Sequence, residues 1–310
     1  MFRYQGQTAA CVCLFLGLIC SLSVSSAALS SSTFSASSPA LAIVSGTVSG
    51  RLVAGYLLVV PISINGRGPW EFVVDTGTNQ TVLDPELARE LHLATAGSVI
   101  LNTLAGPQQA SVAAVYSLSA GGSAVEKIEV LVGGLDAVRA LDGRIRGVLG
   151  LDFLYHFAFS LDYAHARLRL FPPNLLADPE NSSVESVNVR LVSGRLLVPS
   201  MWQDGAERFL ALDSGIAEVL LFEEQEAGPR AMKSDEGRQM LVTNFASTHT
   251  KRISLADFVV GKQRVRGLHG LLLRRTGGVK ELLEDGLLPA SLFRLVFVNP
   301  RARIAAFQEK

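Results

Sequence analysis

An internal repeat limits the folds open to this chain, because two distant stretches share one short pattern. In residues 72–83, FVVDTGTNQTVL, an apolar run leads to Asp75 and a Thr-Gly turn. In residues 209–221, FLALDSGIAEVLL, a similar run leads to Asp213 and a Ser-Gly turn. A single tripeptide of this kind also occurs by chance in ordinary turns after strands. The significance of the repeat therefore depends on the residues around it.

The sequence around the two aspartates repeats as well. A Val-Pro pair precedes each aspartate at the same distance, ending at Pro61 and at Pro199. A leucine follows each aspartate at the same distance, and apolar segments beginning at Gly147 and Gly286 come later at nearly equal distances. A shared order of landmarks at nearly fixed spacing indicates duplication. The chain is therefore expected to form two similar lobes.

The duplication sets the domain boundaries that we expect. The first lobe covers residues 43–171, a proline-containing linker covers 172–185, and the second lobe covers 186–310. Each lobe has enough residues for a core of its own. Short runs rich in Val, Ile and Leu, separated by Gly, Asn and Pro, predict strands in both lobes and an all-β fold.

Two local patterns stand out among the predicted strands. Residues 84–93 predict one short helix, with Asp84 as its N-cap and Pro85 at its first position. Residues 98–118 predict a long β-hairpin, and the second lobe has a counterpart around residues 244–247. The sequence fits both a mobile flap and an ordinary surface hairpin. The candidate flap residues are Leu104, Ala105, Gly106 and Phe245.

The N-terminal residues predict a secretory signal peptide over 1–28, followed by a Ser-rich spacer over 29–42. An uncleaved membrane anchor is the alternative, although the apolar stretch 11–24 is short for a bilayer. We expect a secreted or periplasmic protein that contacts a membrane only if this segment is kept. All three cysteines of the chain fall within it, so the mature chain has no thiol nucleophile and no disulfide.

Charge and histidine content argue against several classes of protein. The chain has 28 basic and 28 acidic residues, so no net field attracts nucleic acid. Its 5 histidines show no spacing typical of metal ligands, and we expect neither a metal nor another cofactor. The remaining candidates for chemistry are the two aspartates.

Two carboxylates held side by side share one proton, and such a pair can act as acid and base on one water molecule. Gly77 and Gly215 would let the two loops approach closely. Thr76 and Ser214 provide hydroxyls for hydrogen bonds between the lobes. The two sites differ at the next position, where the first has Thr78 and the second has Ile216.

This difference suggests which carboxyl holds the shared proton. A hydrogen bond from Thr78 would favour the charged form of Asp75, whereas Ile216 offers no such bond to Asp213. We therefore expect the proton on Asp213 and expect Asp75 to act as the base.

The patterns Asp75-Thr76-Gly77-Thr78 and Asp213-Ser214-Gly215-Ile216, with the segment Val148–Gly150, resemble the aspartic protease superfamily. The chain is similar to a bacterial, retropepsin-like member with both lobes fused. The resemblance implies two pseudo-symmetric β-barrel lobes with a cleft between them. It also implies an endopeptidase that cleaves an extended peptide or protein substrate.

Two points qualify what the resemblance implies. The second lobe has Pro289 where the first has Gly150, so its segment behind the catalytic loop must turn differently. A non-catalytic peptide-binding protein that retains the bilobed fold is the alternative function. We expect a monomer, because both aspartates lie on one chain.

Overall fold

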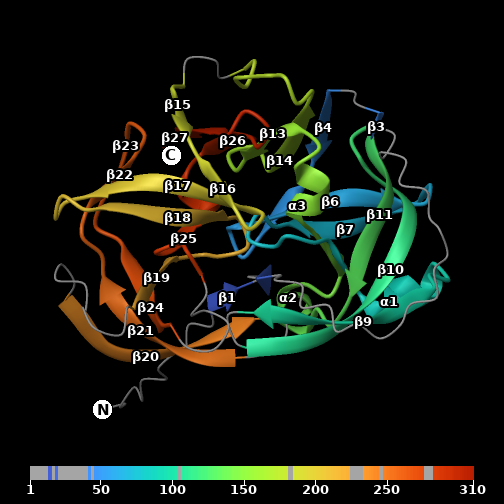
Figure 1. The fold of residues 1–310 in the computed structure, drawn as a ribbon, viewed down its shortest axis with the longest axis horizontal. Coiled ribbons are helices and arrows are strands. Elements are labelled where there is room, and N and C mark those ends of the chain that lie inside the picture. The colour runs from blue at the N-terminus through green and yellow to red at the C-terminus, as the bar shows by residue number, and fades with distance from the viewer. Residues whose placement is uncertain are drawn as a thin grey trace, which may run out of the picture.

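The computed structural model describes residues 13–15, 18–19, 41–42, 45–103, 106–180, 184–223, 233–243, 247–275 and 282–310. Within these residues the chain is nearly all-β and forms three sheets with a few short helices (Figure 1). The fold class predicted from the sequence is confirmed. No helix in these ranges is long and apolar enough to span a bilayer.

The first lobe is built on one sheet, at the right of Figure 1. Its strands are β2 (Leu18–Ile19), β3 (Leu41–Ala42), β5 (Arg51–Val53), β6 (Leu57–Ile64), β7 (Arg67–Val74), β8 (Val82–Leu83), β9 (Thr95–Thr103), β10 (Gly106–Ala120), β11 (Ser123–Val132) and β12 (Ile145–Leu149). They lie in the order β2-β9-β10-β11-β8-β12-β7-β6-β5, and β3 pairs with β11. The helices of this lobe are α1 (Pro85–Glu90), α2 (Asp136–Leu141) and α3 (Leu151–Leu154).

The second lobe, at the left of Figure 1, repeats this plan. Its sheet contains β1 (Cys13–Phe15), β16 (Arg190–Val192), β17 (Arg195–Trp202), β18 (Glu207–Asp213), β19 (Val219–Glu223), β20 (Lys233–Thr243), β21 (Ser247–Ser254), β22 (Phe258–Val260), β23 (Gln263–Val265), β24 (His269–Arg274) and β25 (Gly286–Pro289). A 3-10 turn, η2 (Ala290–Leu292), follows β25.

The strand pairings confirm the duplication that the sequence predicts. In the first lobe, β12 runs parallel to β7 and antiparallel to β8. In the second lobe, β25 runs parallel to β18 and antiparallel to β19 in the same way. Because β7 and β18 lead to Asp75 and Asp213, the two aspartates occupy equivalent places.

A third sheet joins the lobes and lies above and between them in Figure 1. Its strands are β4 (Gly46–Ser49), β13 (Ala158–Asp162), β14 (Arg167–Phe171), β15 (Ser186–Asn188), β26 (Leu295–Asn299) and β27 (Ile304–Gln308). They lie in the order β15-β27-β26-β13-β14-β4, so β13 from the first half pairs with β26 from the second.

The hydrophobic core follows this shared architecture. The largest cluster of buried apolar side chains includes Leu58 and Phe153 from the first half and Val198 and Phe307 from the second. Smaller clusters belong to one lobe each. The two halves thus share one large apolar cluster besides the smaller cluster of each lobe.

The predicted helix and hairpins are present. Helix α1 starts at Pro85, and the Asp84 carboxylate accepts hydrogen bonds from the backbone N–H groups of Glu86 and Leu87 at 2.8 and 3.3 Å. This N-cap is the one that the sequence predicts. The hairpins are β9–β10 and β20–β21. Of the candidate flap residues, Gly106 begins β10, whereas Leu104, Ala105 and Phe245 lie outside the described residues.

Two short pieces of the predicted signal peptide form strands against these hairpins. Strand β1 pairs with β20, where Phe15 lies opposite Thr243. Strand β2 pairs with β9, where Leu18 lies opposite Thr103. The other residues of 1–28, and the predicted spacer except for β3, lie outside the described residues.

Candidate active site

The two aspartates sit at the ends of buried, equivalent strands. Asp75 follows β7, and its backbone N–H donates to the Leu149 carbonyl of β12 at 3.0 Å. Asp213 is the last residue of β18 and lies opposite Pro289 of β25. Both side chains have no exposed surface. Strands β12 and β25 therefore fix the backbone of the two loops that carry these carboxyl groups. The loops are residues 75–78 and 213–216, and we call them the catalytic loops below.

Four reciprocal hydrogen bonds hold the two catalytic loops together. The Thr76 N–H donates to Ser214 Oγ at 2.9 Å, and the Ser214 N–H donates to Thr76 Oγ1 at 3.1 Å. The Thr76 hydroxyl donates to the Leu212 carbonyl at 2.9 Å, and the Ser214 hydroxyl donates to the Val74 carbonyl at 2.8 Å. All four bonds are buried and cross between the lobes, so the separation of the two loops is fixed.

Each carboxylate is anchored through one oxygen. Asp75 Oδ1 accepts from the Gly77 N–H at 2.8 Å, and Asp213 Oδ1 accepts from the Gly215 N–H at 2.8 Å. Both Oδ2 atoms are buried and accept no hydrogen bond from a backbone N–H or a hydroxyl of the described residues, while the two carboxyls hydrogen-bond to each other. A Cβ at Gly77 would lie 2.4 Å from Asp213 Cγ, so only glycine allows this approach.

The electrostatic surroundings favour a pair that holds one proton. Burial raises the pKa of Asp75 well above 3.8, and the negative charge of Asp213 raises it further. Burial also raises the pKa of Asp213, to about 6, although the Gly215 hydrogen bond and the positive charge of Arg195 oppose this rise. The burial of both carboxyls, with the negative charge of Asp213 beside Asp75, therefore favours a pair that shares one proton.

The structure corrects the hydrogen bond that we expected between Thr78 and Asp75. The Thr78 hydroxyl donates to the Gln80 carbonyl at 3.1 Å rather than to Asp75, so the predicted hydrogen bond is wrong. Ile216 is buried in the apolar cluster of the second lobe. The reason that Thr78 gave for placing the shared proton on Asp213 is therefore absent.

The chain turns differently after Gly150 in the first lobe and after Pro289 in the second lobe, as expected. A Cβ at Gly150 would lie 2.5 Å from the Gln80 carbonyl carbon, and the Gly150 N–H donates to Thr81 Oγ1 at 3.1 Å. The chain continues from Gly150 into helix α3. In the second lobe Pro289 ends β25, and the 3-10 turn η2 takes the place of α3.

Asp152 supports the first catalytic loop and was not found from the sequence. Its Oδ2 accepts from the Thr81 N–H at 2.8 Å, and its Oδ1 accepts from the Thr81 hydroxyl at 2.7 Å. Burial raises the pKa of Asp152 to about 6. The available signal was its place two residues after Gly150, where the second lobe has Ser291.

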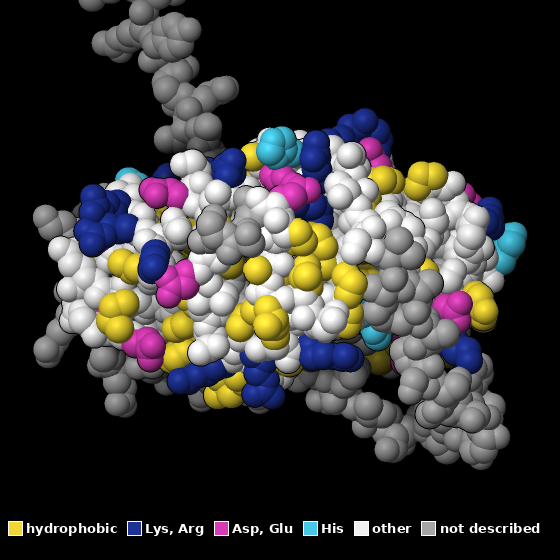
Figure 2. All heavy atoms as spheres, turned by 90° about the horizontal axis from the view of Figure 1, so that it is seen from above, with side chains coloured by type: hydrophobic (Ala, Val, Ile, Leu, Met, Phe, Trp, Pro, Cys, Tyr) yellow, Lys and Arg dark blue, Asp and Glu magenta, His cyan; other side chains and the backbone are white. Residues whose placement is uncertain are grey.

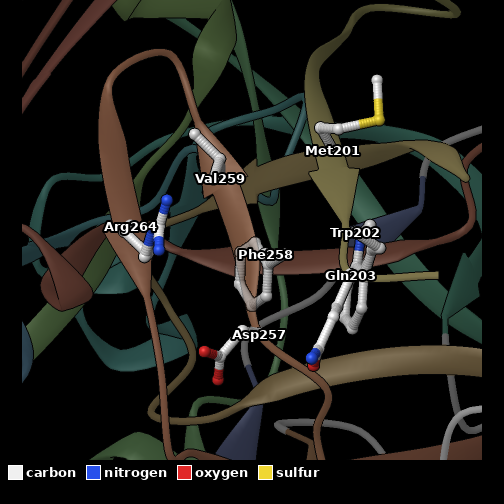
Figure 3. A pocket seen from close by; sticks show the side chains of 7 residues that line it. All are labelled: Met201, Trp202, Gln203, Asp257, Phe258, Val259 and Arg264. Carbon is white, nitrogen blue, oxygen red and sulfur yellow. The ribbon is translucent and has the colours of Figure 1, made fainter. Parts of the chain in front are cut away.

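A pocket of about 250 Å³ lies elsewhere on the second lobe (Figure 3). Its lining includes the Trp202 and Phe258 rings, which stack with centroids 4.5 Å apart. Neither aspartate of the pair lines it, so it is separate from the candidate active site. Among the described residues, no group of three or more His, Cys, Asp or Glu side chains is arranged to hold a metal.

Comparison with known families gives a match to the first lobe. The family model described as aspartyl protease matches residues 60–153, a range that includes Asp75. No curated protein matches the chain.

Comparison with solved structures gives the fold of most of the chain. The aspartic proteinase from Irpex lacteus is 12% identical, with a TM-score of 0.51, and the match covers 86% of this chain and 98% of that one. A retropepsin-like aspartic protease from Rickettsia conorii is 20% identical, covers 43% of this chain and 93% of its own, and has a TM-score of 0.30. Basic 7S globulin from soybean is 11% identical, covers 86% and 94%, and has a TM-score of 0.47. The Irpex lacteus match establishes the fold.

Proposed function

We propose that this chain, whose first lobe matches the aspartyl proteases and whose fold is that of an aspartic protease, is an aspartic endopeptidase. Asp75 and Asp213 would together activate the water molecule that hydrolyses the peptide bond. The substrate would be an extended peptide or an unfolded protein, and the working form would be a monomer.

The reciprocal hydrogen bonds between the catalytic loops are the observation that carries this proposal. They hold two buried carboxyls together, and the Oδ2 of each accepts no hydrogen bond from a backbone N–H or a hydroxyl of the described residues. A carboxylate and a carboxylic acid so placed can accept a proton from water and donate one to the substrate in a single step. A purely structural loop contact would need neither carboxyl.

We assign the role of base to Asp213, whose strand lies next to the one that carries the positive charge of Arg195, and the role of acid to Asp75. Charged Asp213 takes a proton from the water molecule as its oxygen attacks the carbonyl carbon, and neutral Asp75 donates its proton to the carbonyl oxygen. In the second step Asp213 returns its proton to the leaving amine, and Asp75 recovers a proton from a hydroxyl of the tetrahedral intermediate. The peptide C–N bond breaks, and both carboxyls regain their starting protonation states.

The surface and the hairpins support a peptide substrate. Strands β9 and β20, one from each lobe, pair with short N-terminal segments, so both hairpins can add an extended chain by strand pairing. The face shown in Figure 2 carries acidic and basic side chains interspersed.

A cleavage assay with an inhibitor tests the proposal. The purified protein is incubated with an unfolded protein, with and without a statine-type mimic of the tetrahedral intermediate. We expect cleavage that the mimic blocks at concentrations far below those of substrate, since a working pair binds the transition state more tightly. Binding of the unfolded protein without cleavage would instead support the non-catalytic alternative.

We also propose that residues 1–28 direct export and are then removed, which makes the protein secreted or periplasmic. The N-terminal order of Arg3, apolar stretch and small residues supports this. N-terminal sequencing of exported protein should give a start near Ala28. A start at Met1 on membrane-bound protein would support the anchor instead.

A further inference from the structure

Arg195 is a buried charge on the strand next to Asp213. It begins β17, which runs antiparallel to β18 with Leu197 opposite Ala211. Continuing this register by two residues places Arg195 opposite Asp213. Directly opposed residues of an antiparallel pair project from the same face of the sheet. The Arg195 and Asp213 side chains therefore start on the same face, the one that carries the second lobe's own apolar cluster.

The first lobe has an apolar residue at the equivalent position. Strands β6 and β7 pair with Val59 opposite Val73, so the same continuation places Leu57 opposite Asp75. Leu57 is completely buried. The duplicated framework thus holds a leucine beside one aspartate and an arginine beside the other.

The turn before Arg195 is fixed to the first lobe. The Tyr155 hydroxyl donates to the Gly194 carbonyl at 2.7 Å, and the Asn79 side chain donates to the Ser193 carbonyl at 3.0 Å. Asn79 belongs to the loop that follows Asp75. Arg195 therefore lies where the second lobe meets the first catalytic loop.

The guanidinium group is incompletely paired. The Arg195 side chain is 6% exposed, and its Nε lies 3.0 Å from Oε1 of Glu284, whose side chain is 3% exposed. Its Nη1 is buried and makes no hydrogen bond to any described residue. A buried charge with an unpaired N–H destabilises a fold relative to an apolar side chain. Leu57 shows that this framework accepts an apolar residue there, so stability alone does not account for the arginine.

We propose that Arg195 is a positioning residue that keeps Asp213 charged and so assigns it the role of base. The inference rests on the proposed function, because a base is needed only if the pair activates water. Arg195 would extend the range of activity toward lower pH by keeping the pair singly ionised there.

The groups that face the pair are consistent with this role. The positive charge of Arg195 lowers the pKa of both Asp75 and Asp213, against the larger effect of burial. Burial raises the pKa of Tyr163, and the charges of Asp213 and Asp75 raise it further. Burial also raises the pKa of Tyr155, which Arg195 lowers. Both tyrosines stay neutral, and Glu284 offsets part of the arginine charge.

The test removes the charge without leaving its partner unpaired. Arg195→Leu reproduces the residue of the first lobe, and Arg195→Leu combined with Glu284→Leu also removes the buried carboxylate that would otherwise lose its partner. We expect the acid limb of the kcat/KM profile to move upward by about 1 pH unit in the double variant, as for the loss of a nearby opposite charge. Arg195→Lys keeps the positive charge, so its acid limb should lie close to that of the wild type.

Arg208→Leu is the matched control. Arg208 lies on β18, pairs with Asp204 at 2.7 Å and is 19% exposed, yet it is absent from the groups that shift the pKa of either aspartate. The acid limb of the kcat/KM profile of Arg208→Leu should lie at the same pH as that of the wild type. An acid limb that also stays in place in the double variant, with cleavage intact at neutral pH, would overturn the role of Arg195.

A titration that does not depend on turnover separates this inference from the proposed function. The carboxyl carbon of Asp213, assigned by its loss in Asp213→Asn, is followed by ¹³C NMR in the wild type and the double variant. We expect a higher midpoint in the double variant. An unmoved midpoint would overturn the inference whether or not the protein cleaves peptides. If the midpoint of Asp213 rises in the double variant but the wild type cleaves no peptide, the role of Arg195 stands and only the proposed protease activity is contradicted.

Discussion

At the residue scale, Asp75 and Asp213 can each be replaced by an amide that preserves the local structure. The Asn Oδ1 can still accept from the Gly77 or Gly215 N–H. Asp75→Asn and Asp213→Asn should each lower kcat by at least about 100-fold, because the acid or the base is lost. Cleavage rates measure the loss, and circular dichroism checks the fold. Wild-type activity in either variant would rule out the protease.

The pKa of Asp213 also predicts how stability depends on pH. Burial raises this pKa from 3.8 to about 6, so the folded chain binds the proton more tightly than the unfolded chain. The stabilising contribution is complete below about pH 4 and is lost as the pH rises through about 6. Asp213→Asn does not titrate, so its melting temperature relative to the wild type should increase across this range. Parallel melting curves from pH 4 to 7 would contradict the raised pKa.

The residues of the active site show how far the sequence leads. The repeat located both aspartates because its signal, an apolar run followed by Asp and a turn with Gly, consists of adjacent residues. It did not reveal that Thr78 bonds to Gln80, or that Arg195 lies near Asp213 and pairs with Glu284. These contacts depend on which strands become neighbours, and residues 195 and 284 are brought together only by the folded sheet.

At the element scale, the junction of β12 and α3 requires a glycine. A Cβ at Gly150 would lie 2.5 and 2.7 Å from the carbonyl carbon and oxygen of Gln80, which are backbone atoms and cannot turn aside. Gly150→Ala should therefore destabilise the protein by roughly 1–3 kcal/mol. Gly143→Ala is the control, because its added methyl meets nothing within 4 Å. It should change the unfolding free energy by less than about 1 kcal/mol.

Urea unfolding of the two glycine variants measures the difference. Equal unfolding free energies for Gly150→Ala and Gly143→Ala would show that the catalytic loop can shift to make room. Loss of cleavage in Gly150→Ala with unchanged stability would show that the loop moves without unfolding.

Some elements were predictable and others were not, for a physical reason. Helix α1 and the hairpin β9–β10 carry local signals, namely the Asp84 cap and the turn around Gly106. The third sheet carries no such local signal, because β13 pairs with the distant strand β26, where Phe159 lies opposite Val298. Both are apolar runs, and such runs do not specify their partners.

At the scale of the whole molecule, the N-terminal segments occupy the strands beside both hairpin tips. Because β1 and β2 pair with β20 and β9, a chain that retains residues 1–28 should bind substrate less well than one that starts near Ala28. We expect a lower KM for the shortened chain. A synthetic peptide of residues 11–20 should raise that KM again. Equal KM values for the two chains would mean that these segments leave substrate binding unaffected.

The third sheet has a consequence for the timing of synthesis. Its two central strands are β26, from the end of the chain, and β13, from the middle, and β27 lies between β26 and β15. A ribosome reaches β26 and β27 after both aspartates, so the sheet that joins the lobes is completed after the strands that lead to Asp75 and Asp213. Of the three sheets that the structure describes, the sheet that joins the lobes is thus the last to receive all its strands during synthesis.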